Sequence, residues 1–191
     1  MKSTNTEPPM KIKLTEPQRK SAQAARNELS AKNDRLKACR TRRDELIALG
    51  DESRQTAASI VTTGAPAEDA DVTKLLIEER RAAWCEVALE TAQLEMNQAG
   101  EGVRDAVRPA ADAVSRALGP VLQTLLDENI AHLTPMLGEH AARAAANDAL
   151  PVRKLRGFLS SLPLATIAQA GDLLRWLDNI LAGELPAELA E

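Results

Sequence analysis

Two long stretches of the chain carry apolar residues at alternating spacings of three and four, which is the pattern of a coiled-coil seam. The longer stretch has thirteen seam sites, all apolar except Glu78: Leu75, Glu78, Ala82, Cys85, Leu89, Ala92, Met96, Ala99, Val103, Ala106, Ala110, Ala113 and Ala117. The shorter stretch has two charged sites in the matching set Ala22, Ala25, Leu29, Lys32, Leu36, Cys39, Arg43 and Leu46. The pattern predicts two long helices packed along these seams.

Local signals set the expected ends of these helices. Thr15, with Gln18 three residues later, predicts a capped helix start at Glu16, and Gly50 predicts an end near Leu49. The polar residues 50–70 form a long predicted connection. The second helix is expected from about residue 69 to Ala117, with a bend at Pro109.

After residue 117 the chain is interrupted by prolines, each suited to the first turn of a new short helix. We expect helices at about 120–133, 135–149, 151–161 and 164–182, the last ended by Gly183. The near absence of aromatic residues, at 2%, also favours helices over strands. The predicted fold is all-α. A long antiparallel helical hairpin at 15–117 precedes a small C-terminal bundle of short helices at 118–185, with tails at 1–14 (flexible) and 186–191.

A register for the hairpin follows if the one acidic seam site faces a basic one. Arg43 then lies opposite Glu78, Leu46 opposite Leu75 and Cys39 opposite Ala82, so that paired residue numbers sum to 121. A buried ion pair fixes a register better than it adds stability, because desolvation offsets the attraction. The pair Arg43 and Glu78 is our hypothesis for the register-setting contact.

This register leaves part of the second seam without a partner. The first helix supplies contacts only as far as Ala22, which would face Ala99. Five seam sites then need another cover: Val103, Ala106, Ala110, Ala113 and Ala117. The C-terminal helices are one candidate cover, and a second protomer is the other. We favour the second protomer and therefore expect a homo-oligomer.

Charge is distributed unevenly along the chain. Residues 11–43 hold eleven Lys or Arg against three acidic residues, a local charge of +8 in a chain of net charge -4. In the register above, Arg35, Arg42, Lys74 and Arg81 gather without an acidic partner, which makes them candidate partner-binding residues. Three alternatives remain open for these cations: solvent or the acidic connection, a protein partner, and nucleic acid. The acidic connection contains Asp51, Glu52, Glu68, Asp69 and Asp71. Nucleic acid is not favoured, because stacking aromatics and recognised motifs are absent.

The sequence offers little for catalysis. No catalytic, cofactor-binding or metal-binding motif is evident, and Cys39 and Cys85 both occupy seam sites. Without a signal peptide or an apolar span, we expect a cytoplasmic location, or incorporation into an assembly formed there, and no membrane association. The expected function is non-enzymatic. We expect a structural or adaptor protein that binds protein partners through helices, such as a subunit of a phage particle or scaffold. A nucleic-acid-associated protein is the alternative.

Overall fold

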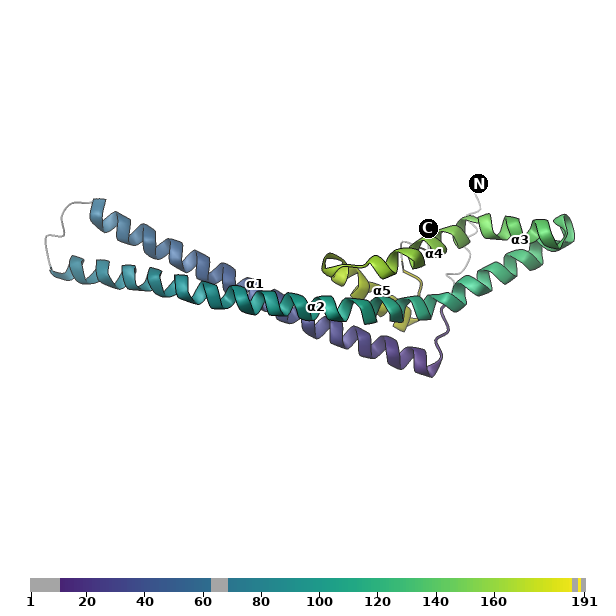
Figure 1. Ribbon diagram of the computed structural model, residues 1–191, viewed down its shortest axis with the longest axis horizontal. Coiled ribbons are helices and arrows are strands. Elements are labelled where there is room, and N and C mark those ends of the chain that lie inside the picture. Colours follow the sequence, from purple (N-terminus) through teal and green to yellow (C-terminus); the bar gives the residue numbers. More distant parts are fainter. Residues whose placement is uncertain (1–10, 63–68, 187–188, 190–191) are drawn as a thin grey trace, which may run out of the picture. The chain divides into compact units, whose positions relative to one another are not determined.

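The computed structural model describes residues 11–62, 69–186 and 189. Its helices are α1 (Glu16–Thr62), α2 (Asp69–Leu137), α3 (Glu139–Asp148), α4 (Leu150–Ser161), the 3₁₀ turns η1 (Leu162–Leu164) and η2 (Ile167–Gln169), and α5 (Ala170–Ala182). The all-α prediction is confirmed. Two long helices pack against each other and shorter helices follow (Figure 1).

The chain divides into two compact units. The hairpin unit is Lys32–Gly102, in which α1 and α2 run antiparallel (Figure 1). The bundle unit combines Met1–Ala31 with Val103–Glu191, so it contains the start of α1, the rest of α2 and the short helices. Each unit has its own buried side chains, including Leu36 and Cys85 in the hairpin and Leu173 in the bundle.

The predicted start of α1 is confirmed by its capping contacts. The Thr15 backbone N–H donates to Gln18 Oε1 at 2.9 Å, and the Gln18 N–H donates to Thr15 Oγ1 at 3.4 Å. These reciprocal bonds form a capping box, which satisfies donors that the first helical turn leaves unpaired.

The predicted end of α1 at Gly50 is wrong. The helix continues to Thr62, and the φ angle of Gly50 is not in the left-handed region that a helix-ending glycine adopts. A Cβ atom added to Gly50 would lie 3.3 Å from Cys85 Cβ, so this glycine serves close approach of the two helices. The long connection predicted at 50–70 is therefore largely helical, and its residues 63–68 lie outside the described residues.

The two seams face each other as predicted, but in a different register. Arg43 Nη1 lies 3.6 Å from Met96 Sδ, and Gly50 packs beside Cys85. Residue numbers at these contacts sum to 139 and 135 instead of 121, a shift of about two heptads. The longer α1 explains the shift, because the point at which the chain turns back moves toward the C-terminus.

The pair Arg43 and Glu78 does not form. Arg43 instead donates to the Asp44 carboxylate at 2.7 Å, and Glu78 lies 3.9 Å from Arg81. Gly50 packs beside Cys85. Moving seven residues along each antiparallel helix from this contact places Glu78 opposite Ala57. The sequence-based register failed because a seam of repeated heptads is satisfied equally well by any shift of seven residues.

The C-terminal helices begin at other positions than predicted, since α2 extends to Leu137, α3 begins at Glu139 and the last helix begins at Ala170 instead of 164. Pro120 and Pro135 lie inside α2 and do not start new helices. Helix α5 ends as expected at Gly183, which has φ 82°, and the Glu184 N–H donates to the Asn179 carbonyl at 2.8 Å. The Gly183 carbonyl accepts from the N–H of Ile12 at 2.9 Å, and Ile12 is buried. Residues 11–14 are therefore not all part of a loose tail, whereas residues 1–10 lie outside the described residues.

Candidate functional site

The most prominent surface feature lies on the side of α2 that faces away from α1 within the hairpin unit. Large apolar side chains are exposed there, with Trp84 59%, Val87 66% and Leu94 63% accessible. We call this surface the outer face and define it by Leu76, Ile77, Arg80, Ala83, Trp84, Val87, Glu90, Thr91 and Leu94. These residues share one side of the helix because they recur at three- and four-residue spacings.

The opposite side of the same segment is the buried seam. Ala82, Cys85, Ala92 and Ala99 are buried there at heptad spacing. Between residues 76 and 94, α2 is thus apolar on two opposite sides, and no described part of the chain covers the outer of these sides. Helices with apolar residues all round are normally enclosed by other structure. The outer face is the surface that residues 11–62 and 69–186 leave without such cover.

Sequence reasoning missed the outer face. Its signal was present as a second apolar repeat at Leu76, Ala83, Val87 and Leu94, offset from the first. The stronger seam of thirteen sites was sufficient to assign a helix, so the weaker repeat beside it was not considered.

The four predicted partner-binding cations do not form one cluster. Arg42 Nη1 is paired with Glu95 Oε2 at 3.1 Å, and Arg35 lies on the same helix seven residues earlier. Arg81 precedes Glu95 by fourteen residues, which is about 21 Å along α2, and Lys74 is one heptad farther away. The register shift separates the two pairs, and Arg81 lies beside Glu78.

Of the acidic residues predicted in the connection, Asp51 has a local partner in Arg54. Arg54 bridges Asp51 at 3.0 Å and Glu86 at 2.9 Å, the latter across the two helices. The hydrogen bond that Arg54 donates to the Glu86 carboxylate raises the pKa of Arg54 above its ordinary value. This pair neutralises Glu86 beside the outer face. The predicted acidic residue Glu68 lies outside the described residues.

The five predicted self-association residues are buried within the single chain. Val103, Ala106, Ala110, Ala113 and Ala117 are all at most 3% accessible. They belong to the bundle unit, where the start of α1 covers them and α5 is tied to α1 by Arg26 and Asp178 at 2.9 Å. The expectation that a second protomer covers them is wrong, because the actual register leaves no length mismatch.

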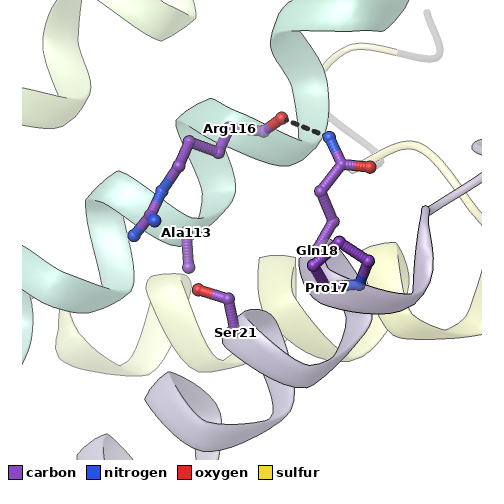
Figure 2. Close-up of a pocket in the computed structure, with 5 residues that line it drawn as sticks. All are labelled: Pro17, Gln18, Ser21, Ala113 and Arg116. Carbon is purple, nitrogen blue, oxygen red and sulfur yellow. Dashed lines mark hydrogen bonds between the residues drawn. The ribbon is translucent and has the colours of Figure 1, made fainter.

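A small hollow of about 200 Å³ lies between the start of α1 and α2 in the bundle unit. Figure 2 shows its lining by Pro17, Gln18, Ser21, Ala113 and Arg116. Gln18 Nε2 donates to the Arg116 carbonyl at 3.0 Å. Pro120, four residues later, has no N–H to give that carbonyl its helical partner, so Gln18 supplies the missing donor. The hollow therefore includes a structural contact, and its lining holds no general base beside Ser21.

Other chemistry is sparse in the described part of the chain. No group of three or more His, Cys, Asp or Glu side chains is arranged there to hold a metal ion. Within the same described ranges, no helical stretch has the length and hydropathy that a membrane span requires. Cys85 is fully buried, and Cys39 is half-buried.

Comparisons with known proteins give no relative. No protein-family model, no curated protein and no solved structure matches this chain significantly.

Proposed function

We propose that this protein is a non-enzymatic structural or adaptor protein that acts by helix–helix contact with a protein partner. The observation that carries the proposal is the outer face of α2. Exposed apolar patches of this kind, bordered by polar residues, mark interaction surfaces in folded proteins. Incorporation into a larger assembly, such as a phage particle or its scaffold, is one form that this function takes.

The dimensions of the outer face suit a helical partner. From Leu76 to Leu94 the face covers eighteen residue steps, or about 27 Å of helix. Its exposed side chains include a tryptophan, a residue type that often supplies much of the binding energy at protein interfaces. A partner helix lying along this face would bury the apolar row.

The nucleic-acid alternative has less support. It depended on Arg35, Arg42, Lys74 and Arg81 acting together, and these residues lie in two separate pairs. Arg42 and Arg81 also lie beside the acidic residues Glu95 and Glu78. No aromatic residue other than Trp84 lies within the hairpin unit to stack on a base.

Site-specific photocrosslinking tests the proposal in cells that naturally contain the protein. A benzophenone amino acid is placed at position 87 on the outer face or, as a matched control, at the exposed position Gln55 on α1. We expect a discrete cross-linked protein only from position 87, and its loss when Leu94→Glu is added. Equal cross-linking from both positions, or none from position 87, would contradict a binding role for this face.

Nucleic-acid binding is tested separately with the purified protein. Binding to DNA or RNA that weakens steeply with salt and disappears when the four cations are changed to Glu would support the alternative function instead.

A further inference from the structure

We propose that the partner on the outer face is a second copy of this chain, lying antiparallel so that a two-fold axis passes near residue 85. The proposal rests on the function proposed above and specifies the partner. It is drawn from the outer face alone and is independent of the alanine-rich segment at 103–117, which is buried within the chain.

The outer face is complementary to itself when reversed. In an antiparallel pair, facing residue numbers have a constant sum, and a sum of 170 or 171 places large apolar residues together. Leu76 and Ile77 of one copy then meet Leu94 of the other, and Ala83 and Trp84 meet Val87. Because the arrangement is two-fold, each contact occurs twice, as an isologous interface requires.

The two charged residues on the face support the same register. Arg80 and Glu90 sum to 170, so each Arg80 faces the Glu90 of the second copy. Neither residue has an opposite charge three or four positions away on its own helix, where side chains share a face. The neighbours three and four positions from Arg80 are Leu76, Ile77, Ala83 and Trp84, and those of Glu90 are Glu86, Val87, Gln93 and Leu94.

The negative charge of Glu86 would oppose the dimer if it were not balanced within its own chain. The two copies of Glu86 approach each other along one edge of the interface, where like charges repel. Each is held by Arg54 of its own chain at 2.9 Å, which neutralises the carboxylate. On the other edge the two Trp84 rings lie near the axis and can cover each other.

A charge-swap experiment tests the second copy directly. Arg80→Glu and Glu90→Arg should each raise the dimer dissociation constant by about tenfold, and the double variant should recover most of the loss. The two residues are about 15 Å apart along one helix, so they cannot rescue each other within a chain. Sedimentation equilibrium gives the constants. Arg40→Glu, at an exposed site on α1, is the control and should change nothing.

Engineered cysteines test the orientation. In a background in which Cys39 and Cys85 are replaced by Ala, a mixture of Ala83→Cys and Val87→Cys chains should form a disulfide between the two variants. Leu94→Cys chains should couple to Ile77→Cys chains and not to one another. Efficient coupling of Leu94→Cys with itself would overturn the antiparallel register.

The mass in solution separates the two proposals. If the partner is a second copy, the protein should form a particle of twice the 20.6 kDa chain mass. This dimer should dissociate on dilution and should be absent in Leu94→Glu. A chain that stays monomeric, yet cross-links a different protein from position 87, would overturn the second copy and keep the proposed function. A monomer with no cross-link from that position would overturn both.

Discussion

Helix α2 is covered on more sides in the bundle unit than in the hairpin unit. In the bundle unit its buried residues include neighbours such as Ala106 with Val107, Ala110 with Ala111, and Ala117 with Leu118. In the hairpin unit the buried residues are single seam sites such as Ala82, Cys85 and Ala92. A helix with one partner buries one stripe, whereas two or more partners bury a wide surface. The apolar residues left over in the hairpin unit form the outer face.

The largest expected difference in the free energy of unfolding is between a substitution in the bundle unit and one on the outer face. Leu177 is fully buried on α5, so Leu177→Ala should lower the free energy of unfolding by about 2–5 kcal/mol. Leu94 is exposed, and Leu94→Ala should change it by no more than about 0.5 kcal/mol. Urea unfolding at a dilution at which the chain is monomeric measures both. A large loss from Leu94→Ala would mean that the outer face is already covered within the chain.

Smaller changes in the free energy of unfolding are expected from substitutions at two glycines of the hairpin unit. Gly50 packs close to Cys85, so Gly50→Leu should overfill the seam and lower the unfolding free energy by about 1–3 kcal/mol. Gly100 has open space around its missing side chain, and Gly100→Ala should raise that free energy by about 1 kcal/mol through helix propensity. Thermal and urea unfolding of the two variants measure these opposite changes in stability. If Gly50→Leu proves harmless, the helices are not in close contact at that point.

The smallest expected change in the free energy of unfolding comes from Gln18, which supplies the donor that Pro120 lacks inside α2. Gln18→Glu keeps an acceptor for the capping box but loses the donor to the Arg116 carbonyl, so it should cost about 1 kcal/mol. In a Pro120→Ala background, residue 120 regains an N–H for that carbonyl, and the same substitution should cost less. A double-mutant cycle of unfolding free energies measures the difference. Equal costs in both backgrounds would show that the two residues are not linked.

Sequence reasoning identified the helical faces but not the helix lengths. Heptad spacing placed Leu36, Cys85 and Ala92 correctly on the buried side of the hairpin. The end of α1 was mistaken because Gly50 allows two structures, a helix end or a close helix contact, and only the residue opposite decides between them. Pro120 was mistaken for a helix start because the donor that replaces its N–H comes from Gln18, which is distant in sequence.

The candidate site was less predictable than the fold. The predicted basic cluster and the predicted self-association residues both depended on the register, so the single error in the length of α1 removed both. The outer face depends only on spacing within α2 and could have been found from the sequence. Features that lie within one helix are thus more safely predicted than those that require two helices to be aligned.

The heptad repeat that made the register ambiguous in the sequence also makes the length of the hairpin adjustable. Residues 33–39 of α1 lie opposite residues 96–102 of α2, because Gly50 packs beside Cys85 and the pairing continues from there. Removing both segments together would leave each remaining seam residue opposite its present neighbour. The hairpin would become shorter by about 10 Å with its packing pattern retained. Its reach can therefore change in steps of one heptad without redesign of its core.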